Sequence, residues 1–434
     1  MDQQRPEKPL RVGFVSTRIS GSDGVSLEIG KWADVLERMG HHCLYVAGQT
    51  DRPADRSIVI PEAHFKHPVI EMITEECFGR EIRTPDVTEM IHEMQWVIKQ
   101  KFRSAVEKLS LEVIIAENCL TIPINIPLGI AVVEHVMETG LPCIAHHHDF
   151  YWERERFLVN AVDDYLHLAF PPPLGQMQHV AINSQAAHEF SRRTGLPCRV
   201  IPNVMDFQNP PPPADDYAAD FRQTIGLAPD DLLFLQPTRV VQRKGIEHAL
   251  ELLHLLRDPR CKLVITHSSG DEGDAYAQRV RRYAEMMGVE VVFADPWVFH
   301  QRGVGPEGQK RYTVQDAYQH ADFVTYPSTH EGFGNAFLEA VYYRKPILCN
   351  RYAIYRTDIE PCGFDVILMD GYLTDETVDR VRQILDDADR RQTMVDRNYQ
   401  VASRFFSYRR VEDELLTILA KPSLARPCGE GIAG

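Results

Sequence analysis

DFVTYPSTHEGFGNAFLEAVYYRKPILCN, residues 322–350, places a buried strand, a glycine turn, a helix and a second buried strand in succession. The apolar run at residues 322–328 leads into the turn Gly332–Asn335, and no helix breaker interrupts Asn335–Tyr343. Near-continuous apolar strands are typical of parallel sheets that helices cover on both faces. The stretch therefore predicts an α/β fold whose ligands bind at the turns that follow its strands.

The same alternation of strand and helix recurs along the chain. Apolar residues at helical spacing predict helices over Val25–Met39, Ile246–Leu256, Tyr276–Met287 and Tyr408–Ala420. The other predicted strands are RVGFVS (11–16), HHCLYVAG (41–48), VIIAE (113–117), PCIAH (142–146), HVAIN (179–183), CRVIPN (198–203), DLLFLQP (231–237), CKLVITH (261–267) and VEVVFAD (289–295).

The run NPPPPADD at residues 209–216 interrupts this alternation. Proline lacks an N–H and fixes φ, so the run cannot continue a helix or a central strand, and we predict a linker. A chain of 434 residues is long enough for two domains. We expect two Rossmann-like, doubly wound domains, 1–208 and 217–405, facing a central cleft, and a disordered tail over 422–434.

Composition limits the classes of partner. The chain has 47 lysines and arginines against 62 acids, a formal net charge of −15, which argues against nucleic acid or anionic membrane as the main partner. Nine cysteines without a CxxC pair fit neither a disulfide framework nor a zinc site. Without a signal peptide or an apolar run of the ~18 residues that a membrane span needs, we expect a cytoplasmic protein with no integral membrane segment.

The turn before the helix at Asn335 predicts an anion site. The first N–H groups of a helix lack intrahelical acceptors, so those of Gly334, Asn335 and Ala336 can bind an anion such as a diphosphate. Glu331, at the mouth of this site, would bind uncharged hydroxyl groups, and Glu339 would project to one side of the helix. The alternative is a capped helix with a solvent-exposed acid.

A second candidate element is TRVVQRKG at residues 238–245, between a strand and a helix. Arg239 and Lys244 could converge on one anion and offset the charge that grows on a departing diphosphate. An ordinary solvated basic loop is the alternative. At the first strand-to-helix turn, ISGSDGV (19–25) contains Gly21 and Gly24 but no GxGxxG, which favours a flexible loop over a phosphate or acceptor rather than an NAD site.

The run AHHHDFYWERERF, residues 145–157, follows another strand. Only His146 and His148 can share a side of that strand, and no second, spaced ligand set accompanies them, so we predict no metal site. A polar His148–Asp149 pair at the strand end is the favoured interpretation, and histidines with satisfied hydrogen bonds are the alternative. Asn183, Ser184 and Asn203 also end strands, where they line the cleft or serve as ordinary turn residues.

These residues resemble, over essentially the whole chain, a retaining GT-B glycosyltransferase of glycosyltransferase family 4, the group of sucrose-phosphate synthases and many bacterial mannosyl- and glucosyltransferases. The carrying motifs are EGFGNAFLE, TRVVQRKG, IPNVMDF and the glycine turn before the first helix. HDFYWERERF bears a fainter resemblance to synthases of compatible solutes such as mannosylglucosylglycerate. Two positions depart from the family pattern, Val204 and His267, because each stands where the family commonly has glycine.

The resemblance implies an N-terminal acceptor-binding domain, a C-terminal nucleotide-sugar-binding domain and a helix, residues 406–421, that returns to the N-terminal domain. It assigns roles residue by residue. The implied catalytic residues are His148, Glu331, Arg239 and Lys244. His148 is the best match for the histidine that touches the donor sugar, and His147 is the second choice. The implied donor-binding residues are Gly24, Arg239, Lys244, Glu331 for the sugar hydroxyls, Phe333, Gly334, Asn335 and Ala336 for phosphate through their amides, and Glu339 for the ribose.

The implied reaction moves mannose or glucose from GDP-mannose or UDP-glucose to a small, polar, anionic acceptor such as a glycerate glycoside or a sugar phosphate. The acceptor hydroxyl attacks on the face from which the nucleotide leaves, and the departing phosphate accepts its proton. No tightly bound cofactor is needed, and a divalent metal ion could stimulate the reaction without being required. A nucleotide-sugar epimerase or hydrolase, and transfer to a glycan or lipid-linked acceptor, are the alternatives. The sequence does not fix the oligomeric state.

Overall fold

The computed structural model describes residues 8–21, 23–270, 273–306 and 308–420. The chain divides into two compact units, the first running through Asn203 and resuming at Tyr408, the second comprising Val204–Ser407. The expected disordered tail, 422–434, lies outside the described residues. Among the described residues, no helix is both long and apolar enough to cross a membrane.

The first unit contains a seven-stranded sheet in the order β3-β2-β1-β4-β5-β6-β7. Every neighbouring pair is parallel. Because apolar side chains fill both faces of the central strands, helices must cover both faces, as the near-continuous apolar runs predicted. The strands are β1 (Arg11–Ser16), β2 (His42–Ala47), β3 (Ser57–Val59), β4 (Val113–Glu117), β5 (Cys143–His147), β6 (Gln178–Ala181) and β7 (Cys198–Val200).

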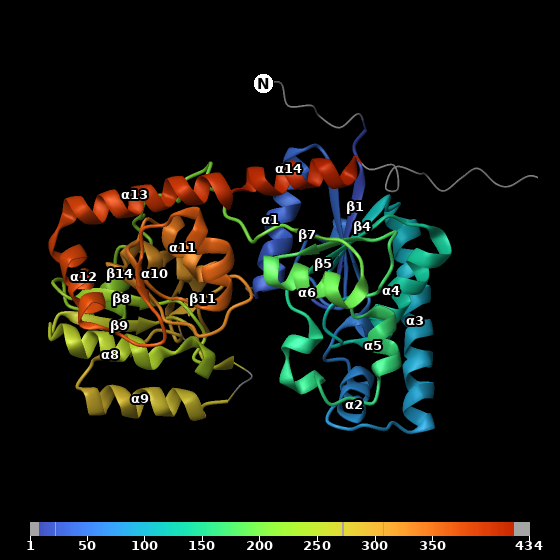
Figure 1. Cartoon of the computed structure of the whole chain (residues 1–434), viewed down its shortest axis with the longest axis horizontal. Helices are drawn as coiled ribbons and strands as arrows, with labels where there is room; N and C mark the ends of the chain where they lie inside the picture. Colours follow the sequence, from blue (N-terminus) through green and yellow to red (C-terminus); the bar gives the residue numbers. More distant parts are fainter. Residues whose placement is uncertain (1–7, 22, 271–272, 307, 421–434) are drawn as a thin grey trace, which may run out of the picture. The chain divides into compact units, whose positions relative to one another are not determined.

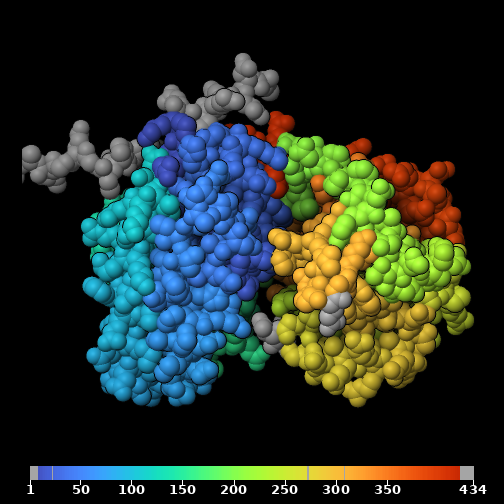
Figure 2. All heavy atoms as spheres, turned by 180° about the vertical axis from the view of Figure 1, so that it is seen from behind, coloured from blue at the N-terminus to red at the C-terminus, as the bar shows by residue number. Residues whose placement is uncertain are grey.

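Helices from distant parts of the sequence cover this sheet. The longest of them, α3, runs beside α4 (Figure 1). In the view from behind, the blue and cyan N-terminal part of the chain forms most of the visible surface of this unit (Figure 2). The helices are α1 (Gly24–Arg38), α2 (Pro68–Cys77), α3 (Pro85–Leu109), α4 (Ile126–Thr139), α5 (Asp163–Ala169), α6 (Ser184–Thr194) and α14 (Tyr408–Leu419).

Helix α14 joins the first unit from the far end of the sequence. It packs against α1 and buries Val411, Leu415 and Ile418. The guanidinium of Arg38 lies 5.0 Å from the ring centre of Tyr408 on α14. The apolar stripe of α14 therefore completes the core of a unit whose other elements all precede residue 204.

The second unit contains a six-stranded parallel sheet in the order β10-β9-β8-β14-β15-β16. Helices α8 and α9 run side by side in this unit (Figure 1). Its strands are β8 (Leu232–Gln236), β9 (Cys261–Ile265), β10 (Val291–Phe293), β14 (Phe323–Tyr326), β15 (Ile347–Asn350) and β16 (Ile367–Met369). Its helices are α7 (Phe221–Thr224), α8 (Ile246–Leu256), α9 (Ala275–Met287), α10 (Val314–His320), α11 (Asn335–Tyr342), α12 (Asp375–Asp386) and α13 (Ala388–Phe405).

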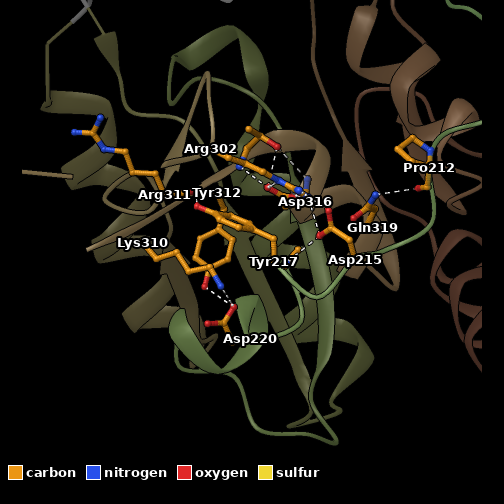
Figure 3. Close-up of polar contacts among 12 residues, drawn as sticks. Pro212, Asp215, Tyr217, Asp220, Arg302, Lys310, Arg311, Tyr312, Asp316 and Gln319 are labelled. Carbon is orange, nitrogen blue, oxygen red and sulfur yellow. Dashed lines mark hydrogen bonds and ion pairs between the residues drawn. The ribbon is translucent and has the colours of Figure 1, made fainter. Parts of the chain in front are cut away.

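The proline-rich run at 209–216 lies within the second unit and is attached to it. Arg302 donates to Asp316 and, at 2.5 Å, to Asp215, while the Gln319 side chain donates to the Pro212 carbonyl at 3.0 Å (Figure 3). Arg302 lies just after β11, the first strand of a short three-stranded sheet. That sheet has the order β11-β13-β12, with β11 (Val298–Phe299), β12 (Gly303–Val304) and β13 (Lys310–Thr313).

The predicted α/β architecture of two Rossmann-like domains is confirmed. The strands predicted at 11–16 and 113–117 and the helix predicted at 246–256 have the observed bounds. Residues 49–112, for which the sequence pattern predicted no element, form β3, α2 and α3. The eight described cysteines are free thiols.

Candidate functional site

The turn that precedes α11 has a backbone that only glycine readily adopts. Gly334 caps the helix with φ 129° and ψ 59°, and a Cβ at this position would lie 2.3 Å from the Tyr352 hydroxyl oxygen. That hydroxyl donates to the Phe333 carbonyl at 2.6 Å. The helix begins at Asn335, as predicted, so its first N–H groups follow a turn held in place by Tyr352.

Glu331 is buried beside this turn and pairs with cations. It is 9% exposed, its Oε1 accepts a hydrogen bond from the Lys244 ammonium, and Arg243 Nη1 donates to its Oε2 at 3.3 Å. Burial by itself would raise the pKa of Glu331, but Lys244 and Arg243 hold it below the ordinary value. The sequence assigned Lys244 to phosphate and Glu331 to sugar hydroxyls, and did not predict that the two pair with each other.

Lys244 is positioned by a tight contact between two loops. Gly245 has φ 58°, and a Cβ there would lie 2.6 Å from the Pro327 carbonyl oxygen at the end of β14. The Thr329 N–H donates to the Arg243 carbonyl at 2.8 Å, which joins the same two loops. Burial lowers the pKa of Lys244, and Glu331 opposes that effect. The close packing therefore brings residues 87 positions apart into one charged cluster.

Arg239 lies on the exposed surface of this region. Its guanidinium is close to Gly270, where a Cβ would be 3.7 Å from Nη1, and the Val240 N–H donates to the Ser268 carbonyl at 3.2 Å. His267 belongs to the same cluster, since burial first and then Arg239 and Lys244 lower its pKa to about 4. The departure from the family pattern at His267 thus adds a neutral imidazole beside the two predicted phosphate-binding cations.

Glu339 lies one turn into α11, half-buried, beside Tyr318. Burial and the adjacent Glu339 carboxylate raise the pKa of Tyr318. The Tyr318 hydroxyl also donates to the carbonyl of Ala336 at 3.1 Å. Phe333 is buried, with its ring centre 5.6 Å from that of Phe406. The predicted donor residues from 331 to 339 therefore form one local structure, and their roles toward a ligand stay predictions.

In the first unit, Gly24 is the exposed first residue of α1. Asp23 caps this helix by accepting from the Ser26 N–H at 3.1 Å, and Arg18 donates to Asp23 at 3.1 Å. Gly21, with φ 75°, donates its N–H to Asp51 at 2.9 Å. These bonds hold the described residues of the loop in place, while Ser22 lies outside the described residues.

The three consecutive histidines of β5 and its following turn lie in different surroundings. His147 is fully buried, with Nδ1 2.7 Å from the Thr121 hydroxyl and Nε2 3.1 Å from His179 Nδ1. His146 is 1% exposed and its ring stacks on Trp32. His148, at 8%, is the most exposed of the three. Of the two histidines considered for contact with a ligand, His147 is a core residue, and His148 remains the candidate.

Glu117, at the end of β4, is the partner that sequence reasoning missed. Its Oε2 lies 3.0 Å from His146 Nδ1 and 3.1 Å from His148 Nε2. Asp149 accepts from Arg154 and from the Asn118 amide, so the expected His148–Asp149 pair is replaced by a His148–Glu117 pair. In-register pairing of Glu117 with His146 between adjacent parallel strands brings these side chains together.

Glu117, His146 and His148 also form a group whose ligand atoms all lie within 4.8 Å of one another. Two histidines and a carboxylate are a ligand set that suits zinc or another transition metal. The sequence had supplied only the two histidines.

Asn183 has the role of an ordinary turn residue, since its side chain caps α6 by accepting from the Ala186 N–H at 2.7 Å.

Acidification is expected to destabilise the first unit through its buried histidines. Burial lowers the pKa of His179 from 6.5 to about 4. Between these values the unfolded chain binds a proton that the folded chain does not, so the free energy of unfolding falls as pH decreases through this window, by at most about 3 kcal/mol. We expect His179→Gln to lose less stability than wild type between pH 7.5 and 4.5 in urea unfolding. Parallel pH curves would contradict this.

Comparison with known proteins identifies the class. Residues 306–401, which contain α11 and its turn, match the family model described as "Glycosyl transferases group 1". The chain is 32% identical to the mannosylglucosylglycerate synthase of Petrotoga mobilis over 381 residues, covering 82% of this chain and 86% of that protein. The chain therefore belongs to the group 1 glycosyltransferases, which have the GT-B fold.

Two further similarities extend over nearly all of the chain. The mannosylglucosylglycerate synthase of Thermotoga maritima is 28% identical over 444 residues, covering 94% of this chain and 99% of that protein. The structure of Anabaena HepE in complex with UDP-glucose superposes with a TM-score of 0.64 at 14% identity, covering 95% of this chain and 99% of HepE. At this identity the HepE structure supports the fold alone.

Proposed function

We propose that this protein is a cytoplasmic, retaining hexosyltransferase that moves mannose or glucose from GDP-mannose or UDP-glucose to a small anionic acceptor. The observation that carries the proposal is the Glu331–Lys244 pair beside the amide turn at Gly334. The cation and the helix N-terminus suit the anionic oxygens of a sugar diphosphate, and the carboxylate suits the hydroxyl groups of its sugar. The names of the two curated relatives support a glycerate glycoside as the acceptor class.

In the proposed scheme, donor binding replaces one partner of Lys244 with another. The diphosphate takes the Lys244 ammonium and the guanidinium of Arg239, and the released Glu331 carboxylate accepts hydrogen bonds from the sugar hydroxyls. Glu339 binds the ribose, and the N–H groups from Phe333 to Ala336 hold phosphate. These groups stabilise the charge that develops on the diphosphate as the sugar–oxygen bond breaks.

The acceptor hydroxyl then attacks on the face from which the diphosphate leaves, and the departing phosphate takes its proton. This scheme retains the configuration at the reacting carbon and uses no protein base. His148 of the first unit contacts the donor sugar, and Gly24 belongs to the loop that receives phosphate or acceptor. No tightly bound cofactor takes part in the scheme.

Thermal-shift measurements with GDP, UDP, ADP and their sugars test the donor assignment. We expect one nucleotide class to raise the melting temperature and its sugar conjugate to be consumed when a glycerate glycoside is added, with an α-linked product identified by NMR. Stabilisation by no nucleotide would refute the donor site. Binding with only epimerised or hydrolysed donor as product would refute transfer.

Lys244→Met is expected to weaken binding of the nucleotide diphosphate by about 10- to 100-fold, because a hydrogen bond to a charged group contributes about 1.5–3 kcal/mol. Calorimetric titration of the full chain measures the affinity. Lys262→Met is the matched control, since Lys262, on β9, pairs with the exposed Glu290 and its replacement should leave the affinity unchanged. An unchanged affinity in Lys244→Met would remove Lys244 from the donor site.

A further inference from the structure

The segment DFYWERERF, residues 149–157, follows His148 and carries charged side chains that the proposed scheme does not use. Two tight turns, Tyr151–Glu153 and Glu155–Phe157, fix its backbone. Phe157 is buried, and its ring meets that of Phe78 edge-on with the ring centres 4.9 Å apart. The segment is therefore anchored at its end, which holds the side chains before Phe157 in defined positions.

A series of hydrogen bonds connects this segment to His148. The His148 N–H donates to the side-chain oxygen of Asn118 at 3.2 Å, and the Asn118 amide donates to Asp149 at 3.2 Å. Asp149 also accepts from Nε of Arg154. Asn118 has φ 57°, a left-handed conformation that is uncommon outside glycine and that clusters at ligand sites. Arg154 is therefore linked to His148 through Asn118 and Asp149.

Arg154 keeps most of its hydrogen-bond donors available. A guanidinium has five N–H donors in a planar fork. Among the described residues, the side chain of Arg154 donates only through Nε, to Asp149. The side chain is 41% exposed, so a ligand can approach its terminal nitrogens, Nη1 and Nη2.

Arg156 has no carboxylate partner in the described part of the chain. Its guanidinium makes no hydrogen bond or ion pair there, and it lies 4.5 Å from the ring centre of Phe157. Partial burial lowers the pKa of Arg156, the charge of Arg154 lowers it further, and Asp149 opposes both effects. The two guanidinium groups are therefore close enough to repel each other, and one hydrogen-bonded carboxylate offsets their two charges.

The other acids of the segment do not supply the missing charge. Glu153 accepts from the Phe150 N–H at 3.3 Å, and burial and the nearby Asp149 raise its pKa to about 7, so it is only partly ionised near neutral pH. Glu155 lies between the two arginines in sequence, is exposed and forms no ion pair with either. An excess of positive charge on two neighbouring guanidinium groups suits an anionic ligand.

We propose that Arg154 and Arg156 bind the carboxylate of the acceptor and thereby select an anionic acceptor. The proposal rests on the proposed function, which assigns His148 to the donor sugar, and adds the residues that recognise the charge of the acceptor. One guanidinium can bind both oxygens of a carboxylate through parallel hydrogen bonds, and the second offsets its charge. The link through Asn118 fixes the position of this charge site relative to the histidine that contacts the donor sugar.

The test compares glucosylglycerate with glucosylglycerol, in which a hydroxymethyl group replaces the carboxylate. Arg156→Gln is the main variant, because Arg156 makes no hydrogen bond in the described part of the chain and its loss should leave the stability unchanged in urea unfolding. We expect KM for glucosylglycerate to rise by about 10- to 100-fold, the size of a lost hydrogen bond to a charged group. KM for glucosylglycerol and the affinity for free nucleotide should stay unchanged.

Three further variants complete the comparison. Arg154→Gln should raise the same KM, and Arg156→Lys, which keeps the charge without the fork, should recover part of the loss. Arg103→Gln is the matched control, since Arg103 on α3 is exposed and pairs with Glu107, and it should change neither KM. An unchanged KM for glucosylglycerate in both Arg154→Gln and Arg156→Gln would overturn the proposal. Equal increases for glucosylglycerate and glucosylglycerol would overturn it as well.

Glucose 6-phosphate tests the other source of negative charge, because a phosphate binds guanidinium groups as a carboxylate does. If transfer to glucose 6-phosphate depends on the two arginines and transfer to glucosylglycerate does not, the carboxylate assignment is wrong. Failure of the proposed function looks different, because wild-type protein would then bind no nucleotide or transfer no sugar. Saturation-transfer NMR without donor would still show glucosylglycerate bound to wild type and not to Arg156→Gln, and equal signals would refute the contact itself.

Discussion

Replacing Glu331 with glutamine is expected to lower the rate of glycosyl transfer by at least about 100-fold while leaving the affinity for free GDP or UDP nearly unchanged. In the proposed complex this carboxylate binds only the sugar, so a neutral amide removes the charged acceptor of the sugar hydroxyls. The nucleotide keeps Lys244, Arg239 and the turn amides. Transfer assays and calorimetric titration with the free nucleotide measure the two effects separately.

The ion pair between Glu331 and Lys244 also sets the choice of variant. Removing the whole side chain would leave a buried ammonium without its main partner, at a cost of about 3–5 kcal/mol in unfolding free energy. Glutamine keeps the shape and can still accept a hydrogen bond from Lys244. Glu339→Gln is the matched comparison, since it should weaken nucleotide binding instead. Equal loss of nucleotide affinity in both variants would contradict this division of roles.

Gly334→Ala is expected to weaken nucleotide binding by on the order of 100-fold. The backbone at φ 129° is unfavourable for alanine, and its Cβ would lie 2.3 Å from the Tyr352 hydroxyl. Strain of this kind costs about 1–3 kcal/mol, and the steric overlap adds a similar amount. The turn must therefore shift, and the N–H groups that follow it move away from the anion site. Calorimetric titration and urea unfolding measure the two consequences.

A double variant separates the two causes. Tyr352→Phe removes the hydroxyl oxygen that the new Cβ would meet, and with it the hydrogen bond to the Phe333 carbonyl. In Gly334→Ala/Tyr352→Phe we expect partial recovery of affinity over Gly334→Ala, with the conformational strain remaining. Wild-type affinity in Gly334→Ala would show that the turn does not bind the phosphate.

Local patterns predicted the inner strands of both large sheets and missed the edge strands β3 and β16. The strands at Arg11–Ser16 and Val113–Glu117 are short, apolar and bounded by turn residues, so their sequence alone determines where they begin and end. The helix at Pro85–Leu109 was not predicted, although its buried apolar residues Val87, Ile91, Ile98 and Phe102 follow helical spacing. The helical pattern was therefore present in the sequence but was not recognised. The strands of the sheet at 298–313 are two to four residues long, too short for any periodicity.

The sequence indicated the individual residues of the candidate site but not the contacts between them. Glycine spacing and charge indicated Glu331, Lys244 and the turn at Gly334. The bond between Glu331 and Lys244 joins residues 87 positions apart, and it depends on the close approach at Gly245 that no local pattern encodes. Glu117 was read only as the last residue of a buried strand. Its role depends on the register of β4 against β5, which places it opposite His146.

The return of α14 to the first unit makes the second unit an insertion within the first. The chain leaves at Asn203 and re-enters at Tyr408, and next to these points the Met205 N–H donates to the Phe406 carbonyl at 3.0 Å. The outgoing and incoming chains are therefore bonded to each other at the root of the second unit. The segment 204–407 is continuous in sequence and holds all of the proposed nucleotide-binding residues except Gly24. Gene rearrangement could thus exchange donor preference as one block without rebuilding the sheet of the first unit.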